Sequence, residues 1–138
     1  MKFKYTICLP DKSEIQYFDE ILNGDQVLEN AKRYPWISQL ELTEKLGVEN
    51  VHYSPSLEFI NTNTNHSFTL TAIYNDRKEL SFSLWYNRPK KVKVLFGILG
   101  EKEKMVVDDI WDYSLTDAIR YLEYFVNDDI KEIEKLYK

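Results

Sequence analysis

The sequence predicts a single α+β domain over residues 1–138, in which an antiparallel meander sheet of about five strands packs against a C-terminal amphipathic helix. The run from His66 to Ile98 alternates apolar and polar residues with period two, and the segment after Ser114 carries an apolar stripe with helical spacing. The length of 138 residues and a hydrophobic content of 43% suit one globular core. An N-terminal hairpin and short helices complete the expected fold.

The charge and the cysteine content of the chain limit the functions and the cell compartment that we expect for it. Residues 101–138 hold 11 acidic and 6 basic residues, a balance of −5 that equals the net charge of the whole chain. An acidic total argues against nucleic-acid binding. Cys8 is the one cysteine, so an internal disulfide is impossible and a reducing compartment is favoured. With neither a signal peptide nor a long apolar run in the sequence, we expect a cytoplasmic protein that does not bind membranes.

The N-terminus predicts a hairpin. Residues 2–9 alternate polar and apolar side chains, and residues 10–13, Pro-Asp-Lys-Ser, are typical of a turn. Residues 14–18 then return as a second strand. The alternative is a short helix from Ser13, because Ile15, Phe18 and Leu22 also have helical spacing.

Two short helices are expected next. The first covers residues 24–34, with Asp25 as a candidate cap for its start. The second covers residues 36–46 and buries Ile37, Leu40 and Leu46. A strand is the alternative for this second segment, because Leu40 and Leu42 also alternate.

The meander is expected to contain strands at about 68–74, 80–86 and 92–98, whose apolar residues all fall on even numbers. Because directly opposed residues of an antiparallel pair point to the same face, the shared parity requires turns of odd length. The first turn is therefore centred on Arg77 and opposes Leu70 to Leu84. The second is centred on Pro89 and opposes Leu84 to Val94.

The remaining segments flank this meander. Residues 51–61 are extended before it, and residues 61–65, Asn-Thr-Asn-Thr-Asn, form the loop that leads into it. After it, residues 101–103 form a charged turn and residues 104–107 a fifth strand.

The C-terminal segment is predicted to be helical. Residues 114–117 form a capping-box pattern. The helical stripe contains Leu115, Ala118, Ile119, Leu122, Phe125 and Val126. Residues 127–129, Asn-Asp-Asp, are expected to break or restart the helix. The stripe should pack on the even-numbered face of the meander, since a one-sided sheet and an amphipathic helix bury each other.

The sequence lacks the common catalytic and cofactor motifs. His52 and His66 have no zinc-ligand spacing, and the 4 glycines are isolated, so neither a P-loop nor a dinucleotide fingerprint is present. We therefore expect no cofactor, no metal and no catalytic residue, and favour a binding protein over an enzyme. Asp108, Asp109 and Asp112 form an acidic group that could hold a hard cation or face a basic partner, although a solvated connection into a helix is the more ordinary interpretation.

The odd-numbered face of the meander is the second candidate surface. It carries Thr69, Thr71, Ser83, Trp85 and Lys93. A tryptophan on a polar sheet face is unusual, and aromatic anchors dominate protein interfaces. The alternative is that the Trp36 region or the N-terminal helix covers this face as a second core.

Residues 85–91, Trp-Tyr-Asn-Arg-Pro-Lys-Lys, are followed by Leu95-Phe96-Gly97 and an acidic amphipathic C-terminal helix. This arrangement over roughly residues 66–138 resembles a theme of small bacterial immunity-type proteins, which neutralise a cognate toxin by binding it. The resemblance implies an acidic, non-enzymatic, cytoplasmic inhibitor, and it carries over no functional residue.

Three functions therefore remain open. The first is a protein-binding module whose partner is a basic toxin domain. The second is a small-molecule binder or enzyme that uses the polar face around Trp85, Thr71 and Ser83. The third is a structural or adaptor domain.

Overall fold

The computed structural model describes the backbone of residues 1–93 and 101–137, and the side chains of residues 1–89 and 109–137. Its elements, in chain order, are β1 (Phe3–Cys8), β2 (Gln16–Leu22), α1 (Gly24–Arg33), α2 (Trp36–Leu46), the 3-10 turn η1 (Val48–Asn50), β3 (Ser56–Asn61), β4 (Ser67–Tyr74), β5 (Leu80–Lys93), β6 (Glu101–Tyr113), α3 (Leu115–Val126) and α4 (Ile130–Leu136).

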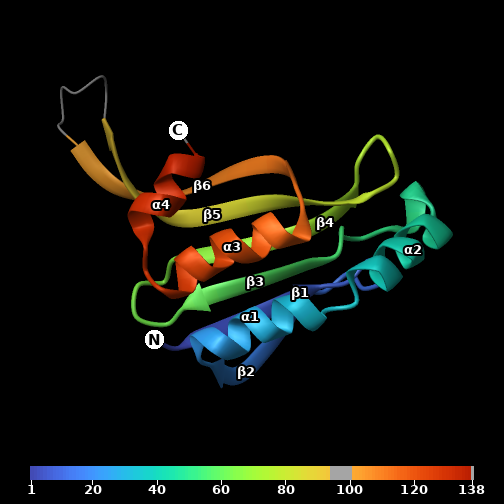
Figure 1. Ribbon diagram of the computed structural model, residues 1–138, viewed down its shortest axis with the longest axis horizontal. Helices are drawn as coiled ribbons and strands as arrows, with labels where there is room; N and C mark the ends of the chain where they lie inside the picture. The colour runs from blue at the N-terminus through green and yellow to red at the C-terminus, as the bar shows by residue number, and fades with distance from the viewer. Residues whose placement is uncertain (94–100, 138) are drawn as a thin grey trace.

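The strands of the described residues form one six-stranded antiparallel sheet in the order β2-β1-β3-β4-β5-β6 (Figure 1). The predicted α+β class is confirmed, with one strand more than the five expected. The N-terminal segment is the predicted hairpin rather than a helix, because β1 and β2 pair antiparallel. On its other side β1 pairs with β3, so the hairpin extends the meander instead of standing apart from it.

The predicted register of the central hairpin is confirmed. Leu70 lies opposite Leu84, and Ala72 lies opposite Phe82. All four side chains are fully buried. The shared even parity therefore did identify the inward face of β4 and β5.

The predicted turn at Pro89 is wrong. β5 continues through Pro89 to Lys93, and Leu84 pairs with Ile110 of β6 rather than with Val94. The physical reason is that β4 ends opposite Asn87, so beyond this point one edge of β5 has none of the described strands beside it. Proline is tolerated at such an edge, because no ladder hydrogen bond is lost there. Residues 94–98 of the predicted third strand lie outside the described residues.

β6 is longer than the predicted fifth strand. Residues 101–103 are not a turn, since they pair with residues 91–93 of β5. Residues 108–112 are not a connection into a helix either, because they continue β6. Between the pairs Phe82–Tyr113 and Leu84–Ile110, β6 contains one residue more than β5, which makes a β-bulge at Trp111 and Asp112.

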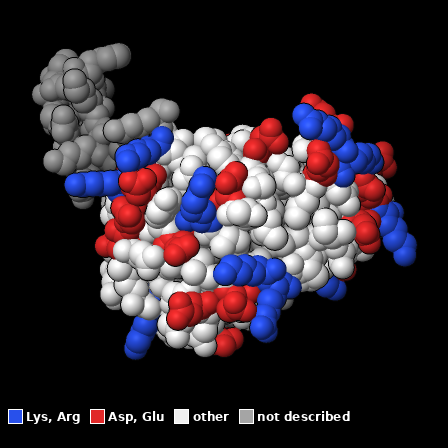
Figure 2. All heavy atoms as spheres, viewed as in Figure 1, with Lys and Arg blue, Asp and Glu red and all other residues white. Residues whose placement is uncertain are grey.

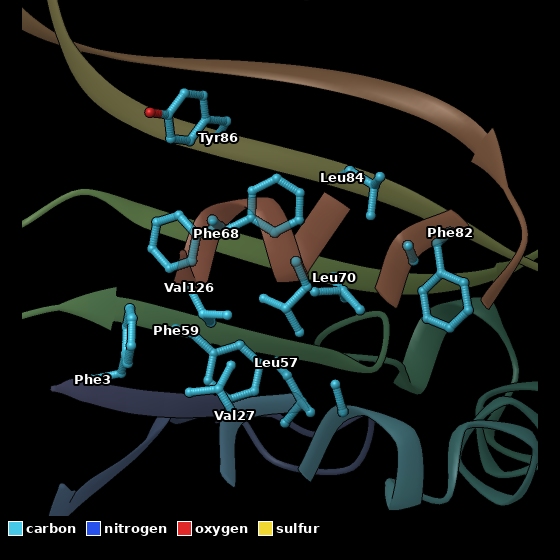
Figure 3. Close-up of a cluster of buried hydrophobic side chains, with 14 of the residues drawn as sticks. Phe3, Val27, Leu57, Phe59, Phe68, Leu70, Phe82, Leu84, Tyr86 and Val126 are labelled. Atoms are coloured by element: carbon cyan, nitrogen blue, oxygen red, sulfur yellow. The ribbon is translucent and has the colours of Figure 1, made fainter. Parts of the chain in front are cut away.

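The helices lie on one side of the sheet, where α1, α3 and α4 are seen in front of the strands in Figure 1. They bury the even face of the meander in a core that Figure 3 shows in part. Trp36 belongs to this core: its ring meets that of Phe82 edge-on at 5.0 Å, and its Nε1–H donates to the carbonyl of Ala31 at 2.8 Å. Neither the Trp36 region nor α1 therefore covers the odd-numbered face, so the second-core alternative is wrong.

Both N-terminal helices are present, and local chemistry sets their ends. Asn23, not Asp25, caps α1, because its side chain accepts from the Gln26 backbone N–H and the Gln26 side chain accepts from the Asn23 N–H. In α2, Leu40 is buried as predicted, whereas Ile37 is 48% exposed. Trp36 takes the inward position that was assigned to Ile37.

The C-terminal helix is broken where residues 127–129 predict it, since α3 ends at Val126 and α4 begins at Ile130. The break lets α4 turn back onto β5. There the buried guanidinium of Arg88 donates to Glu134 through Nε at 3.0 Å and Nη2 at 3.1 Å. The Tyr137 hydroxyl donates to the carbonyl of Leu84 at 2.9 Å. These contacts fasten α4 to the sheet.

Candidate functional site

The side of the sheet that the helices leave uncovered holds most of the predicted site residues. Cross-strand pairing forms one row from Glu58 through Thr69 and Trp85 to Asp109, and a parallel row from Ser56 through Thr71 to Ser83. We call this surface the tryptophan face, and define it by Ser56, Glu58, Thr69, Thr71, Ser83, Trp85, Asp109 and Trp111. Thr69, Thr71, Ser83, Trp85 and Asp109 are thus brought together.

Two tryptophans from neighbouring strands form the apolar centre of this face. The rings of Trp85 and Trp111 lie 6.1 Å apart at an interplanar angle of 70°. The indole N–H of Trp111 donates to Asp109 Oδ2 at 2.7 Å, which fixes the ring beside the carboxylate. Trp111 is 51% exposed, and neither tryptophan belongs to the hydrophobic core. The Trp111 ring is therefore presented to solvent beside a partly exposed Trp85.

Hydroxyl groups surround this centre, and most of them have partners. Ser56 and Thr71 share a hydrogen bond of 2.9 Å between their hydroxyl oxygens. The carboxylate of Glu58 accepts from the hydroxyl of Ser67 at 3.0 Å and from that of Thr6 at 3.4 Å. Ser83 differs, because its fully buried hydroxyl has no hydrogen-bond partner among the described residues. An orphaned buried hydroxyl is rare in proteins.

The one cysteine adjoins this polar network. Cys8 lies opposite Ser56 across the β1–β3 pair. Burial raises the pKa of the Cys8 thiol, and the negative charge of Glu58 raises it further. The thiol is therefore held in its protonated and unreactive form.

Asp112 lies at the edge of the face, beyond the bulge of β6. Its backbone φ is +72°, and its Oδ1 accepts from the hydroxyl of Ser81 at 3.2 Å. It borders a cleft of about 320 Å³ whose lining includes Ile73, Tyr74, Asp76, Ser81 and Trp111. A second cleft of about 290 Å³ is lined by Asn75, Asp76, Arg77 and Asp112. Asp109 and Asp112 thus lie in different places: Asp109 lies beside the tryptophan pair, and Asp112 lines the two clefts.

Two predicted site residues do not fall into this arrangement. Lys93 was expected beside Trp85, but the neighbours of Trp85 across the sheet are Thr69 and Asp109, and Lys93 pairs with Glu101 farther along β5. Asp108 pairs with Tyr86. The side chains of Lys93 and Asp108 lie outside the described residues.

Trp111 is the site residue that the sequence reasoning missed. It stands within the string Asp108-Asp109-Ile110-Trp111-Asp112, which was interpreted as an acidic connection. Had that string been recognised as a strand, the spacing of Asp109 and Trp111 would have placed both on one face.

The carboxylates of Asp109 and Asp112 are free of ion pairs among the described residues. Figure 2 shows the helix side, where basic and acidic side chains are interspersed. Asp109 and Asp112 lie on the other side, and both carboxylates can therefore accept hydrogen bonds from a positively charged partner.

Two further findings concern what the described part of the chain holds. It has no group of three or more His, Cys, Asp or Glu side chains placed to bind a metal ion. None of its helices has the length and apolar character needed to cross a membrane.

Comparison of the chain with protein-family models, with curated protein sequences and with solved structures found no match. The comparisons therefore assign the chain to no family.

Proposed function

We propose that this protein is a protein-binding module and that the tryptophan face is its binding surface. The observation that carries the proposal is the Trp85–Trp111 pair on the side of the sheet opposite the described helices, in which Trp111 is 51% exposed and donates to Asp109. Tryptophan is enriched among the residues that dominate binding energy at interfaces. An indole that burial in the core does not explain is best explained by a partner that covers it.

The charge around the pair supports a basic partner. Asp109 and Asp112 are exposed and without ion pairs among the described side chains, and the chain carries a net charge of −5. Complementary charge speeds association and excludes wrong partners. A partner that presents arginine or lysine beside an apolar patch therefore fits this surface.

An immunity role is the specific form of this function that the resemblance implies, with a toxin domain as the basic partner and the cytoplasm as the place of binding. A toxin gene next to the gene for this chain would supply the partner to test. Co-expression with that toxin should protect the growth of the host cell, and Trp111→Ala should remove the protection.

The general proposal is tested by capture on immobilised protein followed by calorimetry with the purified partner. We expect Trp111→Ala to lower the affinity by about thirtyfold, as for a hot-spot residue worth about 2 kcal/mol. Ile37→Ala is the matched control, since Ile37 is similarly exposed but lies on α2. If the two variants bind the partner as tightly as the unaltered protein, the tryptophan face is not the binding surface.

Small-molecule binding is the second candidate function, and one observation favours it. Ser83, which lies opposite the β6 bulge, has a buried hydroxyl without a partner in the described part of the chain, and a cleft of about 320 Å³ begins at the same bulge. A thermal-shift screen against metabolites would detect such a ligand. A response that Trp85→Ala and Ser83→Ala both leave intact would exclude the tryptophan face as its site. An adaptor role through self-association is tested by light scattering.

A further inference from the structure

We infer that the cleft beside Trp111 receives the side chain of an arginine that the protein partner presents. The inference rests on the proposed binding function and adds to it the chemistry of one contact. It is argued from the walls of the cleft, from its charges and from the bulge that builds it.

The walls combine aromatic and acidic groups. Trp111 and Tyr74 border the cleft of about 320 Å³, together with Asp76 and Asp112. The adjoining cleft of about 290 Å³ shares both carboxylates. These volumes are at the lower limit for ligand pockets, and they suit one inserted side chain better than a large molecule.

The charges of the cleft are open to a cation. Asp112 accepts one hydrogen bond from Ser81 and forms no ion pair with a described residue, so most of its acceptor capacity remains. Arg77 is the base that borders the adjoining cleft. Its side chain is 86% exposed and lies 4.0 Å from Glu79, so it can stay in solvent when another cation enters.

The β6 bulge explains why an indole and a carboxylate share the cleft. Successive side chains of a regular strand point to opposite faces, so Trp111 and Asp112 would normally lie on different sides of the sheet. The extra residue and the positive φ of Asp112 bring both to one cleft. Bulges re-aim side chains in this way beside functional sites.

Arginine fits this combination better than other cations. Its planar guanidinium stacks on an aromatic ring and donates bidentate hydrogen bonds to a carboxylate, whereas lysine offers a compact charge. A bound metal is a poorer match, since the described residues include no set of three suitable ligands.

The test uses two blocked tripeptides, acetyl-Gly-Arg-Gly-amide and its citrulline counterpart, which has nearly the same shape but no charge. Their binding is followed by the NMR signals of the tryptophan indole N–H groups, with Trp111→Phe to assign the Trp111 signal. We expect the arginine peptide to shift that signal with a dissociation constant of about 1 mM, and the citrulline peptide to bind at least about tenfold more weakly.

Variants connect this binding to the cleft. Asp112→Asn should weaken the arginine peptide by about tenfold, because it removes one charge and leaves the shape unchanged. Asp19→Asn is the matched control, since Asp19 is exposed on β2 at the opposite edge of the sheet. Equal binding of the two peptides, or equal effects of the two variants, would overturn the inference. Free agmatine binding more than about tenfold tighter than the arginine peptide would also overturn it, because the site would then serve a small cation.

This result can be separated from the proposed function. If Trp111→Ala abolishes partner binding while Asp112→Asn leaves the partner affinity unchanged, the arginine cleft is refuted and the protein-binding function stands. If the peptide binds through Asp112 and the capture experiment yields no partner, the protein-binding function fails while the cleft still recognises an arginine side chain.

Discussion

Replacing Arg88 by methionine is expected to lower the free energy of unfolding by about 3 kcal/mol. The Arg88 side chain is 4% exposed and forms two charge-assisted hydrogen bonds with Glu134, at 3.0 and 3.1 Å. Its guanidinium also lies over the ring of Tyr86 at 4.8 Å from the centroid. Removing one partner of a buried ion pair costs about 3 to 5 kcal/mol. We take the lower value because Glu134 is 35% exposed, so its carboxylate can turn to water.

Urea unfolding measures this loss. With an m-value of about 1.5 kcal/mol/M, a loss of about 3 kcal/mol moves the midpoint by about 2 M. Arg120→Met is the control, because its pair with Asp117 is 55% and 41% exposed and should contribute at most about 0.5 kcal/mol. A double-mutant cycle with Glu134→Gln should give a coupling energy of about 1 to 2 kcal/mol. If Arg88→Met shifts the midpoint no further than Arg120→Met, the ion pair does not fasten α4 to the sheet.

Three further predictions concern stability. Burial raises the pKa of Tyr34 and of Tyr86 to about 12, and the charge of Glu134 adds to the shift at Tyr86. An unfolded tyrosine ionises near pH 10, so the unfolded state releases its protons first as the pH rises. The contribution of these tyrosines to the free energy of unfolding should therefore be fully present below about pH 10 and should be lost as the pH rises toward 12. Tyr34→Phe and Tyr86→Phe should each remove part of this pH dependence, which urea unfolding at graded pH measures. Asn23→Ala should cost about 1 kcal/mol by thermal unfolding, whereas a change of Asp25→Ala beyond about 0.5 kcal/mol would contradict the assignment of the cap. Ser83→Ala should stay within about 0.5 kcal/mol of the unaltered protein, since its hydroxyl has no partner among the described residues; a larger loss would mean that another group or ordered water satisfies it.

The central hairpin was predictable because one rule determines it. Shared parity of the apolar residues in β4 and β5 requires an odd turn, and the burial of one whole face excludes any other register. The C-terminal helix was predictable for a similar reason, since its cap at Ser114 and its break after Val126 are both local signals. Patterns within one segment, or within two segments adjacent in sequence, were therefore sufficient to predict these elements.

The errors arose where a neighbouring strand decides the outcome. Pro89 has the local character of a turn residue, but it lies in β5 where β4 has already ended. Residues 108–112 have the composition of a solvated connection, but they belong to β6, and residues 108–110 pair directly with β5. In both cases the structure depends on which strand lies alongside the segment, and the local sequence pattern does not contain that information.

The candidate site was predictable in part for the same reasons. Trp85 followed from the alternation of β5 alone. Trp111 and its bond to Asp109 did not, because only the pairing with β5 shows that their segment is a strand. That the face lacks a covering helix could be learned only from the packing of Trp36 against Phe82.

The pairing of β1 with β3 has a consequence for the order of folding. β3 to β6 are joined in sequence, so their pairs close short loops, whereas β1 reaches β3 only across β2, α1 and α2. Non-local pairing bears a larger loop-closure entropy and slows folding. We therefore expect the β1–β3 seam to close last. Trp85 and Trp111 both lie on the part that closes locally, so the surface proposed to bind the partner should take shape before the N-terminal hairpin docks.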